Sequence, residues 1–432
     1  MKRGALLSAL ALLLAPPGSS VAGVPSPRLL ERGDELGLYS LAGNPAGGRL
    51  VVVSREFPPD GPRLDVFDAP PAGPFGSASR ATGPVFDTVA ALGPDGTAAI
   101  LGTPPSRSGT IGSGLIAVVR PPGAGSAETR TLTPASIDDP FVAFDRQGNA
   151  MALWIRSSNG TSDESFVEES TRPHGGDWSA PVGISHELHS TYRPQVAFDA
   201  VGDAIAVWVR TPHNKAEVVA SMRPTGGSFG PPEVISDPRF DSDEPSLSVN
   251  AAGEAGVVWV QLTKNDAHFQ VGGAFRTRGQ PFGPPQLFTA ARAEATGASV
   301  ALDDQGAALL TWRIPYRKAG DGVNAFWIKV AHRPPGGPLS RAVRVGGPWT
   351  ETGQLAVAPS GRGKIAWIYN GLRHDLVQAR NVTTTGGVGP VRQISPFGTI
   401  GSLHLTIDDS AATTFAWTRR RHHLDRLETI RR

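Results

Sequence analysis

The segments FVAFDRQGNAMALW (residues 141–154) and QVAFDAVGDAIAVW (195–208) are two copies of one pattern, an apolar alternating run, a D-x-x-G turn and a second apolar run that ends on Trp. Its Trp recurs at 154, 208, 259, 312, 367 and 417, with spacings of 54, 51, 53, 55 and 50 residues. Two earlier copies, YSLAGNPAGGRLVVV (39–53) and VAALGPDGTAAILG (89–102), lack the Trp. Eight copies of this period indicate a repeat architecture.

A second pattern with a Pro-Gly-Gly turn follows most copies, as in STRPHGGDWSAPVGIS (170–185) and ASMRPTGGSFGPPEVIS (220–236). Each unit then contains four short apolar or alternating runs separated by turns, and no segment of the repeats has helical periodicity. This predicts an all-β fold, a β-propeller of about eight four-stranded blades. A seven-bladed ring with one irregular extra unit is the alternative, because the first two copies are degenerate.

The conserved spacing within each copy predicts specific structural roles. The side-chain oxygens of Asp145, Asp199 and Asp303 are placed to accept backbone N–H groups at the start of a turn, and the Gly three residues later supplies a positive φ. The Trp row ends the most apolar run, where a large ring fills the wedge between blades. Both features are therefore predicted to be structural.

The two ends of the chain predict how the ring closes. The last copy stops before a fourth strand, and residues 27–31 precede the first copy without a partner. We expect residues 27–31 to pair as the outer strand of the blade that contains Trp417, which covers an open sheet edge. Residues 23–432 are predicted to form this single propeller domain.

Residues 1–22 have the features of a signal peptide. Lys2 and Arg3 precede an apolar run over residues 5–15, and small residues at Ser20 and Ala22 mark the cleavage site. An apolar run this short does not cross a bilayer of ~30 Å. We therefore expect a secreted monomer, extracellular or periplasmic, without a transmembrane segment.

Composition excludes several classes of function. The 41 basic and 39 acidic side chains leave a net charge of +2, which gives no basic surface for nucleic acid. The absence of Cys excludes disulfides, thiolate metal sites and cysteine nucleophiles. No cofactor motif is present, and we predict neither a cofactor nor a metal site; the expected partner is an unidentified protein or carbohydrate.

The paired motifs P-x-V-A-x-D-x-x-G-x-A-x-x-x-W and R-P-x-G-G-x-W/F resemble the repeats of secreted bacterial β-propeller proteins. These are in turn similar in outline to sialidase-type propellers, whose turn motif is S-x-D-x-G-x-x-W. In the present chain Trp follows Asp by nine residues instead of five. The resemblance implies a propeller fold, and for activity it implies only the possibility of sialidase-like chemistry.

The loops opposite the D-x-x-G turns are the expected place for a site, because variable loops on a rigid scaffold commonly bind ligands. Four cations, Arg55, Arg156, Arg210 and Arg419, stand two residues after the Trp position. They either form a partial ring that binds an anionic ligand or end their strands in water and pair with loop acids such as Asp138, Asp139, Asp243 and Glu244.

Further candidate ligand-binding residues lie on the same face. His186, His189 and Tyr192, with Arg193, form the densest polar and aromatic group in a blade-crossing segment, and Tyr369 occupies the position that Arg has in four other copies. An H-x-x-H pair on a loop is weak evidence for a metal. The acidic segment 237–244 has oxygen ligands of the kind that Ca²⁺ takes but no turn glycine.

These observations leave three hypotheses for function. The first is an exported non-catalytic propeller that binds a protein, a glycan or a cell-envelope component. The alternative is a sialidase-like glycoside hydrolase, which needs an Arg cluster, a Tyr nucleophile and carboxyl groups. A quinone-dependent dehydrogenase is the weakest, because vicinal Cys are absent. The first hypothesis is our expectation, with no catalytic residue assigned.

Overall fold

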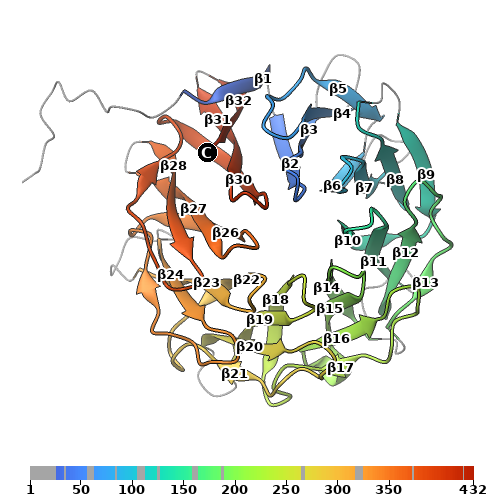
Figure 1. The fold of residues 1–432 in the computed structure, drawn as a ribbon, viewed down its shortest axis with the longest axis vertical. Coiled ribbons are helices and arrows are strands. Elements are labelled where there is room, and N and C mark those ends of the chain that lie inside the picture. The colour runs from blue at the N-terminus through green and yellow to red at the C-terminus, as the bar shows by residue number, and fades with distance from the viewer. Residues whose placement is uncertain are drawn as a thin grey trace, which may run out of the picture.

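The computed structural model describes residues 26–33, 36–55, 63–82, 85–104, 112–123, 127–157, 164–185, 189–263, 268–316, 325–371, 374–421 and 423–432. In these ranges, thirty-two strands form eight four-stranded blades arranged in a ring (Figure 1). The only helical segment among the described residues is a short 3-10 turn, Pro212–Asn214. The predicted eight-bladed propeller is confirmed, and the seven-bladed alternative is wrong.

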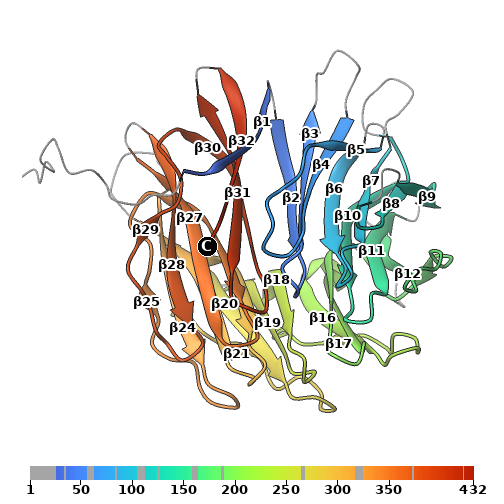
Figure 2. The same cartoon turned by 45° about the horizontal axis from the view of Figure 1, so that its top comes forward.

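The blades follow one another in chain order, each from its innermost to its outermost strand (Figure 2). Blade 1 contains β2 (Leu36–Gly43), β3 (Arg49–Arg55), β4 (Arg63–Ala69) and β5 (Ser79–Thr82), and blade 2 contains β6 (Phe86–Leu92), β7 (Ala98–Thr103), β8 (Leu115–Arg120) and β9 (Glu128–Thr133). Blade 3 contains β10 (Ile137–Phe144), β11 (Ala150–Ser157), β12 (Ser165–Arg172) and β13 (Val182–Gly183), and blade 4 contains β14 (Thr191–Phe198), β15 (Ala204–Arg210), β16 (Glu217–Arg223) and β17 (Glu233–Val234).

Blades 5 to 8 repeat this arrangement. Blade 5 contains β18 (Asp241–Val249), β19 (Ala255–Leu262), β20 (Phe269–Arg276) and β21 (Gln286–Leu287), and blade 6 contains β22 (Thr296–Leu302), β23 (Ala308–Pro315), β24 (Phe326–Arg333) and β25 (Val343–Arg344). Blade 7 contains β26 (Thr350–Val357), β27 (Arg362–Asn370), β28 (Asp375–Thr383) and β29 (Arg392–Gln393), and blade 8 contains β30 (Thr399–Ile407), β31 (Thr413–Arg421), β32 (Leu424–Arg431) and β1 (Arg28–Gly33).

The ring closes through a strand from the N-terminal end of the chain. β1 pairs antiparallel with β32, with Arg28 opposite Thr429 and Gly33 opposite Asp425, and lies beside it in Figure 1. Leu30 packs against a core cluster that combines residues of blades 1 and 8. The predicted closure is therefore confirmed, and the strand extends two residues beyond the expected segment.

The turn and Trp predictions are also confirmed. Asp145 Oδ1 accepts the backbone N–H groups of Gln147 and Asn149 at 2.9 and 2.8 Å, and Gly148 has φ of 87°. Trp154 is fully buried, in a cluster that joins blade 3 to blade 2. The same arrangement recurs around the ring because each Trp stands at the same register position.

The connections define two faces. The D-x-x-G and Pro-Gly-Gly turns, which join the first strand of a blade to the second and the third to the fourth, lie on what we call the turn face. The connections from second to third strand and from blade to blade lie on the opposite, loop face. The sequence prediction of one face for the turns and one for the loops is confirmed.

No helix among the described residues is long and apolar enough to cross a membrane. The predicted signal peptide, residues 1–22, lies outside the described residues, and signal-peptide cleavage remains a prediction.

Closure by β1 makes a testable prediction for stability. A variant that begins at residue 34 exposes the edge of β32 and loses the packing of Leu30, so its melting temperature should fall by several degrees. A Glu31→Gln variant, which keeps the strand, serves as the control and should melt like the parent. Thermal melts followed by circular dichroism test this, and coincident curves for the truncated and full chains would contradict it.

Candidate functional site

Three of the four predicted arginines lie in ion pairs within their own blades. Arg156 Nε donates to Glu168 Oε1 at 2.8 Å, and its guanidinium lies 4.0 Å from the centre of the Phe166 ring. Arg210 Nε lies 3.3 Å from Glu217 Oε2. In each pair the acid comes from the neighbouring strand, so the charge of the arginine is balanced inside the blade.

The most buried of these pairs is Arg419 and Glu428, with side chains 5% and 4% exposed. Arg419 Nε donates to Glu428 Oε2 at 2.9 Å, and Trp417 Nε1 donates to the same oxygen at 3.0 Å. Trp154 donates to Glu168 in the same way, at 2.9 Å. In blades 3 and 8 the Trp and the Arg two residues later therefore share one carboxylate, whereas in blade 4 Trp208 Nε1 has no partner and Glu217 binds Arg210 alone.

This geometry corrects the partners that we expected. We predicted that unbound arginines would pair with the loop acids Asp138, Asp139, Asp243 and Glu244, but the carboxylates come from the adjacent third strand of each blade. The side chain of Arg55 lies outside the described residues. A carboxylate ligand at Arg156, Arg210 or Arg419 has to displace an acid that the protein already supplies.

The other predicted site residues are not brought together. His186 lies outside the described residues, and His189 forms an isolated backbone bridge with Ser165. Tyr369 packs against the core between blades 6 and 7. Only Tyr192 lies beside a group of charged side chains. Burial, followed by the charge of Asp243, raises the pKa of Tyr192 to about 12.

The charged group beside Tyr192 follows from a bulge that all eight inner strands share. Each inner strand shifts register near its loop-face end, for example between Asp138 and Phe141 in β10. In four successive blades the bulge holds a non-glycine residue with positive φ: Asp87 (48°), Asp139 (47°), Arg193 (56°) and Glu244 (53°). Strained residues of this kind concentrate at functional sites.

We call Asp87, Asp138, Asp139, Arg193, Asp243 and Glu244 the mouth cluster, because they lie at the loop-face ends of the inner strands of blades 2 to 5. Arg193 connects three blades. Its backbone N–H donates to Asp139 Oδ2 at 2.8 Å, and its Nε lies 3.3 Å from Asp243 Oδ1. Glu244 Oε2 accepts the backbone N–H of Gly297, at 3.2 Å, from the next blade.

Asp138 is the electrostatically distinct member of the mouth cluster. Asp138 is an exposed residue, and the partial desolvation of its carboxyl, followed by the charges of Asp139 and Asp87, raises the pKa of that group. A carboxyl group whose pKa is raised by burial and by neighbouring carboxyl groups is a candidate for acid–base catalysis. Asp87 belongs to blade 2 and Asp138 to blade 3, so the interaction depends on how adjacent blades are placed.

A cavity of about 260 Å³ adjoins the cluster at Glu244 and Gly297. Its wall includes Trp312 and Arg313; Arg313 Nε donates to Thr296 Oγ1 at 3.1 Å, and its guanidinium lies 4.7 Å from the centre of the Phe326 ring. An aromatic wall with a cation and a carboxylate suits a sugar ring, which has apolar faces and polar edges.

A second row of arginines lies near the turn face. In each blade we consider the second-strand residue four positions before the Trp position together with the residue that pairs with it across the hairpin to the third strand. In seven of the eight blades one member of this cross-strand pair is Arg. We call these the turn-face arginines: Arg49, Arg120, Arg172, Arg223, Arg276, Arg333 and Arg432. In blade 7 the corresponding pair is Gly363 and Val382.

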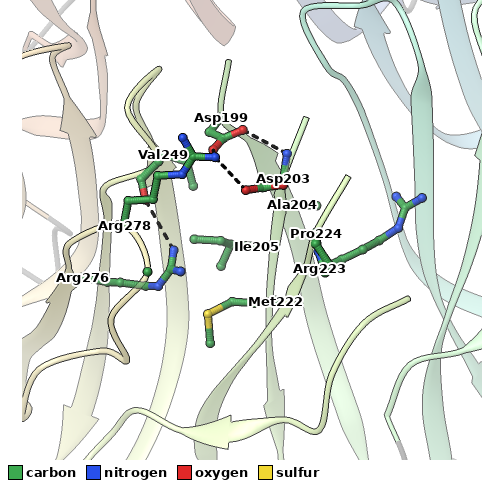
Figure 3. A pocket seen from close by; sticks show the side chains of 12 residues that line it. Asp199, Asp203, Ala204, Ile205, Met222, Arg223, Pro224, Val249, Arg276 and Arg278 are labelled. Atoms are coloured by element: carbon green, nitrogen blue, oxygen red, sulfur yellow. Dashed lines mark hydrogen bonds and ion pairs between the residues drawn. The ribbon is translucent and has the colours of Figure 1, made fainter. Parts of the chain in front are cut away.

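Figure 3 shows one groove of this row, a cavity of about 240 Å³ between blades 4 and 5. The guanidinium of Arg278 lies 3.0 Å from Asp203 and 3.5 Å from Asp199. Ile205 and Met222 form an apolar wall below, and Arg223 extends away from the other arginines. The two acids that line this groove offset part of the charge of its three arginines, Arg223, Arg276 and Arg278.

Sequence reasoning missed the turn-face arginines, and it named Asp138, Asp139, Arg193, Asp243 and Glu244 without predicting that they form one cluster with Asp87. The arginines had a signal, the R of R-P-x-G-G, which we used only as part of a turn motif. The mouth cluster had a weaker one, a polar or charged residue six positions before the Asp of the D-x-x-G turn, as at Asp139 and Arg193. No group of three or more His, Asp or Glu within the described ranges is arranged to hold a metal ion.

No family model and no curated protein matches the sequence. Among solved structures, an ulvan lyase of polysaccharide lyase family PL25, bound to -[GlcA(1-4)Rha3S]-, is similar with a TM-score of 0.51 and 11% identity, covering 92% of this chain and 95% of the lyase. A puromycin hydrolase has a TM-score of 0.48 and 15% identity, covering 90% and 59% of the two chains. An α-L-arabinofuranosidase from Fusarium graminearum has a TM-score of 0.42 and 12% identity, covering 68% and 93%.

At these identities the likeness establishes the propeller fold. It also corrects our expectation for function. We predicted a non-catalytic binding protein. That prediction is wrong, because the ulvan lyase, a similar propeller that covers 92% of this chain, is an enzyme.

The Arg419–Glu428 pair makes a prediction for stability. Arg419→Met leaves Glu428 buried without its partner, so the free energy of unfolding should fall by about 3–5 kcal/mol. Arg156→Met at the equivalent position, where Arg156 is 33% exposed, should cost a smaller amount, about 1–2 kcal/mol. Urea unfolding of both variants tests this; equal losses would show that burial of the pair does not set its contribution.

Proposed function

We propose that this protein is a glycoside hydrolase, built on a sialidase-like propeller, that cleaves a polysaccharide at the mouth cluster on the loop face. The observation that carries the proposal is the raised pKa of Asp138 among Asp139 and Asp87. Glycoside hydrolysis requires one carboxylic acid that keeps a proton and one carboxylate nearby. Asp138, whose pKa is raised, is our candidate for the acid, and Asp87 of the adjacent blade is our candidate for the carboxylate.

Each residue of the cluster then has a distinct task. Asp138 protonates the glycosidic oxygen as the bond to the leaving sugar breaks, and Asp87 either activates the attacking water or attacks the sugar carbon itself. Arg193, held by Asp139 and Asp243, positions the acids of neighbouring blades. The cavity beside Glu244 and Arg313 would hold a neighbouring sugar of the chain.

The proposal replaces the tyrosine nucleophile of the sialidase mechanism with a carboxylate. Burial and the charge of Asp243 raise the pKa of Tyr192 to about 12, which disfavours the phenolate that a nucleophilic Tyr must provide. The arginines that a sialidase would use for a substrate carboxylate are paired with Glu168, Glu217 and Glu428. The solved ulvan lyase with this fold binds a polysaccharide, which supports a polymeric glycan as the substrate.

The test is release of reducing ends from a panel of neutral and uronate-containing polysaccharides. Asp138→Asn should lower kcat by about 10²–10⁴-fold, the usual contribution of a general acid, and Asp87→Asn should lower it as strongly. Asp177→Asn, an exposed acid of a Pro-Gly-Gly turn, is the matched control and should leave activity unchanged. Full activity in Asp138→Asn, or a product with an unsaturated sugar that identifies a lyase, would contradict the proposal.

The pH dependence gives an independent prediction. Because Asp138 has a raised pKa, its acid form persists to a higher pH than that of an ordinary Asp, and activity should fall as pH rises through that pKa. In Asp87→Asn one of the charges that raises the pKa is gone, so the alkaline limb of kcat/KM should move to lower pH. A limb that stays in place would show that Asp138 is not the acid.

A further inference from the structure

The turn face has one groove whose charge differs from the others. It lies between blades 7 and 8 and contains a cavity of about 400 Å³. Its wall includes Arg362 and Lys364 of β27, Asn381 of β28, Thr413 of β31 and the turn-face arginine Arg432. None of the residues that line this cavity is Asp or Glu.

Polar atoms in this cavity lack partners. The hydroxyl of Thr413 is buried without a hydrogen bond, and the residue is 0% exposed. Nε and Nη2 of Arg432 are also buried without a partner, although its main-chain N–H and oxygen pair with Thr413 at 2.8 and 2.6 Å. Buried donors without acceptors are costly, so three such atoms in one cavity indicate a missing acceptor.

The cations of this groove repel one another. Burial, followed by the charges of Arg432 and Arg392, lowers the pKa of Lys364, and burial with the charge of Arg392 lowers the pKa of Arg432. Lys364 donates a hydrogen bond to Asn381 Oδ1, a neutral acceptor. The groove therefore concentrates positive side-chain charge, and none of the side chains that line it is acidic.

The other grooves show what is missing. Each of five turn-face arginines interacts with an acid of the preceding blade: Arg49 with Asp408, Arg120 with Asp68, Arg223 with Glu169, Arg276 with Glu233 and Arg333 with Glu254. Arg49 is also repelled by Arg431, which itself pairs with Asp408. At Arg432 the preceding blade supplies Lys364 and Arg392 instead. The charge that the other grooves obtain from an acid is absent here.

We propose that the groove between blades 7 and 8 binds an oxyanion, a phosphate, sulfate or carboxylate group, between Lys364, Arg432 and Thr413. The anion accepts from the Thr413 hydroxyl and from the buried guanidinium nitrogens of Arg432, and it balances the charge of Lys364. Such charge-assisted hydrogen bonds are the strong class. The site lies on the face opposite the mouth cluster, so it does not rest on the proposed hydrolase activity.

The experiment uses the full chain and inorganic phosphate as the probe, by isothermal titration and by thermal melts, with sodium chloride at matched ionic strength as the reference. Phosphate should bind with a single site and raise the melting temperature above the chloride reference. Lys364→Met and Arg432→Met should each weaken phosphate binding at least tenfold. Arg276→Met, in the acid-lined groove between blades 4 and 5, is the matched control and should leave phosphate affinity unchanged.

Thr413→Val, which is isosteric and keeps all charges, tests the buried hydroxyl and covers the case in which a charge variant fails to fold. It should fold and bind phosphate more weakly. A glucuronate disaccharide and a sulfated disaccharide, compared with free phosphate and sulfate, distinguish a glycan acid group from a free ion. Equal effects of phosphate and chloride, or unchanged affinity in Lys364→Met and Thr413→Val, would overturn the proposal.

Discussion

Closure of the ring is the constraint on which the other features depend. A propeller blade buries both faces against its neighbours, so the last blade has to meet the first, and its fourth strand comes from the opposite end of the chain. Once β1 pairs with β32, the ring is closed and the first strand of every blade lies innermost, around the axis of the ring. Repeat positions that are far apart in sequence then lie at the same height around it.

Because of this regularity, residues at one repeat position form a row around the ring. The inner-strand bulge of blades 2 to 5 places Asp87, Asp139, Arg193 and Glu244 at equivalent points of the loop-face mouth. The turn-face arginines, which lie in the cross-strand pair four positions before the Trp position, place a cation in most grooves of the turn face. Function on such a scaffold arises where a copy departs from the repeat, because the shared residues stabilise every blade alike.

The fold could be predicted from the sequence because its signals are local and repeated. The Trp spacing gave the blades, Asp145 and its equivalents gave the turns, and the unpaired segment 27–31 gave the closure. The site could not be predicted in the same way. Its residues interact across blades, as Asp87 does with Asp138, and the sequence pattern within one repeat carries no information about which side chain of the next blade faces it.

The arginines show the same limit. Their positions after Trp were visible in the sequence, but their partners Glu168, Glu217 and Glu428 lie on the neighbouring strand. The register between the second and third strands of a blade decides that pairing, and this register became known only with the structure. The signal peptide and export remain sequence predictions, since they fall on residues outside those that the structure describes.

The central claim is that Asp87 of the neighbouring blade helps to raise the pKa of the Asp138 carboxyl. Titration of the Asp138 carboxyl by carbon-detected NMR, in the parent and in Asp87→Asn, measures this without an assay of activity. The account predicts a pKa above that of an ordinary Asp in the parent and a lower value in Asp87→Asn. An ordinary pKa for Asp138 in both proteins would contradict it.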